Sequence, residues 1–111
     1  MIFITGPLYS GKRNYAQGLL GCTAEELKSR AVWDVQELAR ERRDLEALAE
    51  ELSRWEVVIA TETGGGVVPL DPAEREAREA AGRLSCLLAE RAETVVRVFC
   101  GLPSVLKGSL K

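Results

Sequence analysis

The sequence of 111 residues contains no histidine. Without an imidazole, a histidine general base, a Ser-His-Asp triad, a phosphohistidine intermediate and most zinc sites are excluded. The chain also lacks an apolar run of the roughly 20 residues that span a bilayer, so no membrane partner is expected. Basic residues are not in excess, because the formal net charge is -2 and the sequence pI is about 5.3. Nucleic acid is therefore not an expected partner.

Cysteine is scarce, and the spacing of the cysteines indicates no disulfide or metal-binding pair. Cys22, Cys86 and Cys100 are odd in number and form no C-x-x-C pair, so a disulfide framework is not expected and a reducing cytoplasm fits better. Cys86 and Cys100 stand among apolar residues and are predicted to be buried, inert thiols. The first five residues have no positive charge and no cleavage site, so no secretory signal is expected and the predicted location is cytoplasmic.

Strand-like and helix-like patterns alternate along the chain. Apolar residues make up 46% and charged residues 29%, which predicts one globular domain over residues 1–111. Crossover connections between such elements predict a small α/β domain with a parallel sheet. Residues 104–111 are predicted to be a loose tail or a contact arm. The predicted strands cover residues 2–5, 31–35, 56–61 and 94–100, and the predicted helices cover 12–20, 24–30, 36–55 and a stretch that Asp71 and Pro72 open.

A phosphate-binding pattern lies between the first predicted strand and the first predicted helix. Residues 6–13 match seven of the eight positions of G-x-x-x-x-G-K-[ST]. In such a loop the glycines let backbone N–H groups point inward, and the lysine reaches the terminal phosphates. The alternative is a glycine-rich turn that binds nothing. The predicted nucleotide-binding residues are Gly6, Pro7, Leu8, Tyr9, Ser10, Gly11, Lys12 and Arg13, with Lys12 also predicted to be catalytic.

The last position of this pattern departs from it. Arg13 stands where a Ser or Thr hydroxyl would coordinate magnesium, and a guanidinium has no lone pair to give a metal, although it can pair with a phosphate. Asp34, after the second predicted strand, is the candidate metal-side acid; its alternative is a helix cap with Glu37. Glu62 ends the third predicted strand and is the second catalytic candidate, or an ordinary solvated loop residue.

Two further basic residues have no local context that favours a function. Arg97 lies in the fourth predicted strand, and Lys107 lies near the end of the chain. Both are predicted to be solvated surface residues.

Four short stretches together resemble one protein family, the bifunctional adenosylcobinamide kinase/adenosylcobinamide-phosphate guanylyltransferases of cobalamin biosynthesis. The resemblance covers residues 1–20 and almost all of residues 31–107, and its second half is more specific because phosphate loops are widespread. The stretches are Thr5-Gly6 through Lys12, Glu62-Thr63-Gly64-Gly65-Gly66-Val67-Val68-Pro69, Ala81-Gly82-Arg83-Leu84, and Phe99-Cys100-Gly101-Leu102-Pro103 followed by Leu106-Lys107.

The resemblance implies a fold, an activity and partners. The fold is a RecA-like P-loop NTPase, a three-layer sandwich with a mainly parallel sheet, here reduced in size. Members are cytoplasmic, form homotrimers and use GTP or ATP with Mg²⁺ to phosphorylate adenosylcobinamide, then transfer GMP through a guanylylated histidine. By position, Gly6, Gly11 and Lys12 would hold phosphates, Asp34 would be the metal-side acid, and Glu62 would lie near the nucleotide.

The chain also departs from that family. It is far shorter than family members, with the missing part between Gly21 and Ala31, and Tyr9 stands where the family usually has arginine. Because histidine is absent, the guanylyltransferase step is predicted to be lost, and Arg13 argues against the kinase step. Two functions stay open: a nucleotide-binding relative with kinase-like activity toward cobinamide, or a non-catalytic remnant that binds nucleotide or corrinoid or forms trimers.

Overall fold

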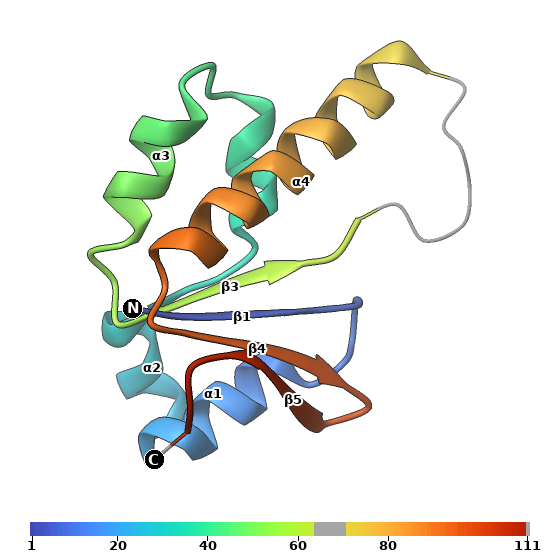
Figure 1. Ribbon diagram of the computed structural model, residues 1–111. Helices are drawn as coiled ribbons and strands as arrows, with labels where there is room; N and C mark the ends of the chain where they lie inside the picture. Colours follow the sequence, from blue (N-terminus) through green and yellow to red (C-terminus); the bar gives the residue numbers. More distant parts are fainter. Residues whose placement is uncertain (64–70, 111) are drawn as a thin grey trace.

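Five strands form one mixed sheet in the computed structural model, which describes residues 1–63 and 71–110. The order across the sheet is β2-β3-β1-β4-β5 (Figure 1). β1 pairs in parallel with β3 and β4, β2 pairs in parallel with β3, and β5 runs antiparallel to β4. The strands are β1 (Ile2–Gly6), β2 (Ala31–Val32), β3 (Val57–Thr61), β4 (Thr94–Phe99) and β5 (Leu102–Lys107).

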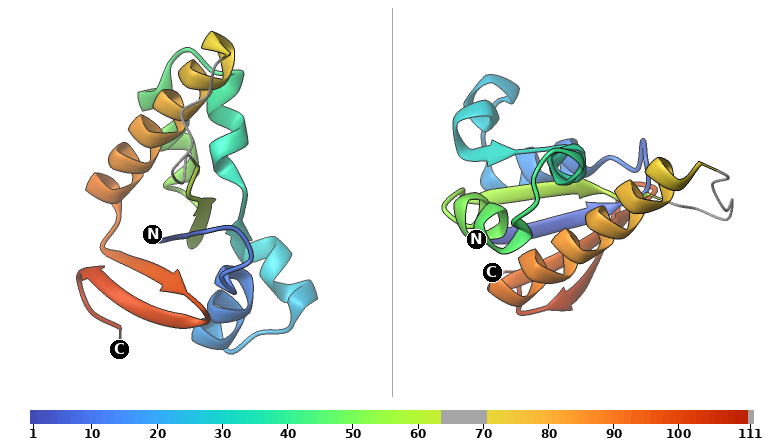
Figure 2. Two further views of the ribbon diagram at one scale, coloured as in Figure 1. Left: turned by 90° about the vertical axis from the view of Figure 1, so that its right-hand side faces the viewer. Right: turned by 90° about the horizontal axis from the view of Figure 1, so that it is seen from above.

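Helices cover both faces of this sheet. One face packs against α1 (Lys12–Leu20) and α2 (Ala24–Arg30), and the other against the 3₁₀ helix η1 (Val35–Arg40), α3 (Leu45–Leu52) and α4 (Pro72–Arg91) (Figure 2). Successive strand residues point to opposite faces, so Phe3 joins the core beneath α3 and α4 while Ile4 joins the core beneath α1 and α2. The predicted three-layer α/β sandwich with a mainly parallel sheet is confirmed.

Two helix starts follow from short-range capping. Thr23 and Glu26 form a reciprocal capping box, with the Thr23 N–H donating to Glu26 Oε1 at 2.8 Å and the Glu26 N–H donating to Thr23 Oγ1 at 3.1 Å. Asp71 Oδ1 accepts from the Ala73 N–H at 3.0 Å, and Pro72 occupies the first turn of α4. These side chains satisfy amide groups that have no partner inside their own helix, so both predicted starts are found.

The predicted helix over residues 36–55 is wrong. The segment divides into η1 and α3, because the Asp44 carboxylate accepts from the Ala47 N–H at 3.0 Å and starts a new helix. The two pieces share one buried face, which explains why their apolar residues mimic a continuous period. The predicted strand over residues 31–35 is also shorter, because Asp34 adopts a φ of 57° and turns the chain out of the sheet.

The prediction of a tail or contact arm over residues 104–111 is wrong for its first part, which is β5. Val98 pairs with Pro103 and Phe99 with Leu102, so Cys100 and Gly101 alone form the hairpin turn. Both turn residues have positive φ, as a two-residue turn between twisted strands requires. Pro103 is tolerated because β5 is an edge strand.

The predicted burial of two thiols is also wrong. Cys86 and Cys100 are exposed, and Cys22 is half-buried. Cys100 lies in the hairpin turn, outside the sheet. Cys86 faces outward on α4, whose sheet-facing positions are taken by Leu84 and Leu88. In the described part of the chain, no helix is both long and apolar enough to cross a membrane.

Candidate phosphate-binding site

The loop between β1 and α1 lies at the carboxyl edge of the parallel strands, where α/β sheets place ligands. Both neighbouring strands anchor it. The Glu62 N–H, just after β3, donates to the Gly6 carbonyl at 2.8 Å, and the Gly101 N–H, in the β4–β5 turn, donates to the Ser10 carbonyl at 2.8 Å. The loop is therefore fixed by segments that are far apart in the sequence.

Gly6 is required by a close backbone approach. A Cβ atom at this position would overlap the Val98 carbonyl oxygen of β4 and lie 2.9 Å from Ser10 Oγ. At the other end of the loop, Gly11 has a φ of 90° and serves as the N-cap residue of α1. The two glycines of the phosphate-binding pattern thus have separate roles: one admits the neighbouring strand, and the other turns the chain into the helix.

Lys12 is buried inside the loop, with 7% of its surface exposed. Its Nζ donates to the Pro7 carbonyl at 2.6 Å and lies 3.4 Å from Ser10 Oγ. Burial lowers the pKa of the Lys12 ammonium, while the nearby carboxylates of Asp34 and Glu62 act in the opposite direction. The loop therefore encloses a cation close to the N-terminus of α1, an arrangement suited to an anionic oxygen.

A pocket of about 430 Å³ opens beside the loop. Tyr9 projects from the loop almost fully into solvent. The residues lining the pocket come from the loop, the start of α1 and the ends of β2 and β3; they are Leu8, Tyr9, Ser10, Gly11, Lys12, Arg13, Asn14, Trp33, Asp34, Ile59 and Thr61.

Asp34 and Arg13, two of the residues that the sequence singles out, both line this pocket. Asp34 Oδ1 accepts from the Thr61 hydroxyl at 3.4 Å, and its side chain does not cap η1, so the alternative capping role is wrong. The Thr61 N–H is held by Gln36 Oε1 at 2.9 Å. The Arg13 guanidinium lies over the Trp33 ring, 5.3 Å from the ring centroid.

Glu62 lies at the end of β3, but its carboxylate is already paired. Arg97 Nε donates to Glu62 Oε2 at 2.7 Å, and Arg97 Nη2 donates to Oε1 at 2.8 Å. These hydrogen bonds hold the pKa of the Glu62 carboxyl below its usual value. The pair spans β1, because Arg97 is on β4. Arg97 also lies 5.6 Å from the Phe99 ring centroid. Glu62 is thus held ionised near the loop by two charge-assisted hydrogen bonds.

Arg97 is half-buried and Lys107 is exposed at the surface, as expected, but each side chain also has specific partners. Arg97 orients a candidate site residue, as described above. Lys107 Nζ donates to the carbonyls of Ala89 and Glu90 at 3.0 Å each, which satisfies the C-terminal turn of α4 and ties β5 to it. Neither partner could be found from sequence spacing, because both depend on where β4 and β5 lie relative to other elements.

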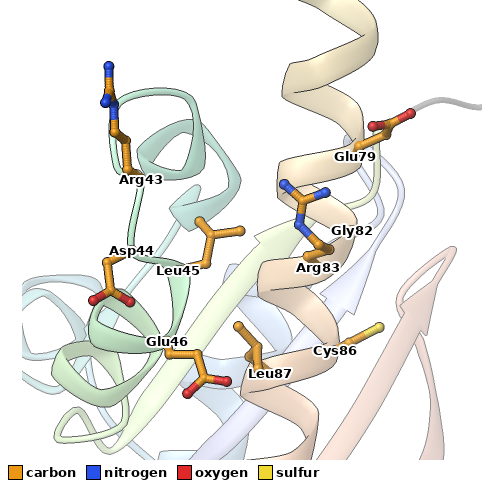
Figure 3. A pocket seen from close by; sticks show the side chains of 9 residues that line it. All are labelled: Arg43, Asp44, Leu45, Glu46, Glu79, Gly82, Arg83, Cys86 and Leu87. Atoms are coloured by element: carbon orange, nitrogen blue, oxygen red, sulfur yellow. The ribbon is translucent and has the colours of Figure 1, made fainter.

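A larger groove of about 860 Å³ lies between α3 and α4, away from the loop (Figure 3). Leu45 and Leu87 face each other across it, and Gly82 and Arg83 of the family-like helical stretch border it. The glycines at positions 64–66 and the rest of the stretch through Pro69 lie outside the described residues. The structure therefore brings together the loop, Asp34 and Glu62, and it places the family-like helical stretch elsewhere.

Comparison with known proteins places the chain beside one protein family and one of its members. The sequence model of the family described as cobinamide kinase / cobinamide phosphate guanyltransferase (CobU) matches residues 22–106. The bifunctional adenosylcobalamin biosynthesis protein CobP of Pseudomonas aeruginosa is 41% identical over 75 residues, which are 68% of this chain and 43% of that protein. The chain thus matches less than half of that relative. The phosphate loop precedes the residues that the family model matches, so its interpretation rests on its own geometry.

Proposed function

Because the chain belongs to the cobinamide kinase / cobinamide phosphate guanyltransferase family, we propose that it binds the phosphates of GTP or ATP in the loop from Gly6 to Arg13. The observation that carries this proposal is the Lys12 ammonium, buried in a loop that two neighbouring strand ends anchor at the carboxyl edge of the sheet. A cation and a helix N-terminus there favour a terminal phosphate.

The proposed reaction is kinase-like phosphoryl transfer to adenosylcobinamide. An acceptor hydroxyl oxygen would bond to the γ-phosphorus, the hydroxyl proton would pass to solvent or base, and the bond to the bridging oxygen would break to release the nucleoside diphosphate. Lys12 would stabilise charge on the transferred group. Glu62 would stay ionised near the loop, with Arg97 fixing its direction. Guanylyl transfer through histidine is not proposed, because the 111-residue sequence contains no histidine.

A second candidate function is nucleotide or corrinoid binding without turnover. Two observations favour it: the oxygen ligand for magnesium is replaced at Arg13, and both carboxylate oxygens of Glu62 are occupied by Arg97. Such a protein would hold its ligand and release it unchanged. The two functions share the phosphate loop and differ only in turnover.

Self-association is also proposed, as a homotrimer. β5 is an edge strand with every residue exposed, and it carries Leu102 and Leu106 with 70% and 62% of their surfaces accessible. Unpaired strand edges that carry apolar side chains are ready to pair with another chain.

The loop is tested by Lys12→Ala. Loss of a charged hydrogen bond should weaken GTP or ATP binding by about 1.5–3 kcal/mol, roughly ten- to one-hundred-fold in affinity. Isothermal titration calorimetry measures this, with a thermal unfolding curve to show that the variant is folded. Lys28→Ala is the matched control, because Lys28 is an exposed lysine on α2 whose partner is Glu25. If Lys12→Ala binds nucleotide as tightly as the parent, the proposed site is wrong.

A further inference from the structure

Two cations and one carboxylate face the pocket beside the phosphate loop. Lys12, Arg13 and Asp34 are the charged residues among those that line it. Lys12 is held by oxygens of the loop itself, and Asp34 accepts from the Thr61 hydroxyl. Arg13, in contrast, lies over an aromatic ring, and among the described residues no carboxylate or carbonyl accepts a hydrogen bond from its guanidinium. Arg13 is thus the charged group in the pocket whose donors are not already used.

Trp33 holds that guanidinium through a cation–π contact. The Trp33 ring packs in part against the core beneath α1 and α2, and the Arg13 guanidinium lies over it at 5.3 Å from the centroid. A cation over the face of an aromatic ring is attracted by the ring's quadrupole, and this interaction uses none of the guanidinium N–H donors, which stay available for a phosphate. Arg13 is the second residue of α1, so its charge follows directly after Lys12 at the helix N-terminus.

A magnesium ion does not fit this set of side chains. In loops of the complete pattern, the residue at this position supplies a hydroxyl oxygen to the metal, and magnesium accepts oxygen ligands in an octahedron. Arg13 supplies only N–H donors and a fixed positive charge. The remaining carboxylate, Asp34, is shared with Thr61. Among residues 1–63 and 71–110, no three Asp, Glu, Cys or His side chains come together as a metal site.

We propose that this site binds polyphosphate in its metal-free form. The Arg13 guanidinium, held over the Trp33 ring, then neutralises phosphate charge that a magnesium ion neutralises in complete phosphate loops. The inference rests on the proposed function of the loop. It narrows the ligand to a nucleoside triphosphate or inorganic tripolyphosphate without bound magnesium, so a chelator should not abolish binding. Magnesium in excess competes for the phosphate oxygens and brings a second positive charge toward Arg13, so it weakens binding.

The test uses the whole chain in a Trp55→Phe background, which leaves Trp33 as the one tryptophan. Binding of ATP, GTP and inorganic tripolyphosphate is measured by calorimetry, once with excess Mg²⁺ and once with a chelator, and Trp33 emission reports the site. Arg13→Ser restores a hydroxyl at the metal-ligand position. Arg54→Ser is the matched control, because Arg54 precedes β3 at the amino edge of the sheet, opposite the loop.

The expected result is tight binding in chelator, weaker binding in Mg²⁺, and a change in Trp33 emission. Arg13→Ser should lose roughly ten-fold or more of the chelator affinity, the effect of one charged hydrogen bond, and should bind more tightly when Mg²⁺ is added. Arg54→Ser should behave as the parent.

Two different results separate the inference from the proposed function. If the parent requires Mg²⁺, or if Arg13→Ser has the parent's metal dependence, the inference is overturned while the loop still binds phosphate. If none of the three ligands binds, or if binding leaves Trp33 emission unchanged and is insensitive to Lys12→Ala, the proposed loop function fails as well.

Discussion

Replacing Gly6 by alanine is expected to destabilise the fold strongly, although the change adds a single methyl group. The added Cβ would overlap the Val98 carbonyl oxygen and lie 3.2 Å from the Val98 carbonyl carbon. Both atoms belong to the backbone of β4, which pairs with β1 on one side and β5 on the other. Relief would require a central strand to move, and that would break pairing on both sides.

The magnitude follows from two contributions. Overpacking in a well-packed interior costs about 1–3 kcal/mol. A backbone conformation that side chains rarely adopt costs about 1–3 kcal/mol more, and Gly6 has a φ of 156°. The total, about 2–6 kcal/mol, is a large share of the roughly 5–15 kcal/mol by which folded chains are stable. For a chain of this size, it corresponds to a fall in Tm on the order of 10–30 °C.

The assay is thermal unfolding followed by circular dichroism. Gly82→Ala is the matched control, because Gly82 lies inside α4 and a Cβ there has nothing within 4 Å. That change should stabilise the protein by about 0.5–1 kcal/mol, since alanine favours helix and restricts the unfolded chain. The same substitution thus has opposite signs at the two sites. A Gly6→Ala protein that unfolds at the parent's temperature or above would refute the steric argument.

Three other outcomes are expected. The pKa values of Glu62 and Glu56 are lowered, chiefly by hydrogen bonds from Arg97 and Arg30, so these pairs stabilise the fold above pH 4.5 and lose that effect as pH falls through the lowered values. Tm should therefore drop on acidification below pH 4.5, and the drop should be smaller in Glu62→Gln; an equal drop would contradict this. Incubation with labelled GTP and magnesium should leave no label on the chain after denaturing electrophoresis, since histidine is absent, and a surviving band would reveal another nucleophile. Light scattering at micromolar concentration should give the mass of a trimer, and a strictly monomeric mass would contradict self-association.

The features that the sequence determines by itself act over short distances. The capping box at Thr23 and the Asp71 cap join atoms within three residues of each other, so their effect does not depend on the rest of the fold. The phosphate loop is similar, because its glycines and Lys12 lie in one turn between a strand and a helix. Asp44 also acts locally, because its carboxylate caps α3 by accepting from the Ala47 N–H. An aspartate at this position is a sequence signal that residues 36–55 divide into two helices.

Tertiary structure decides the features that depend on strand order. Asp34 accepts a hydrogen bond from Thr61, which is 27 positions away in the sequence, and Glu62 accepts one from Arg97, which is 35 positions away. The second pair forms only because β1 lies between β3 and β4, an order that no local pattern encodes. Arg13 meets Trp33 because β2 ends beside the start of α1. Residue types and local spacing therefore predict the loop and its candidates, whereas the order of the strands across the sheet determines which charges each candidate meets.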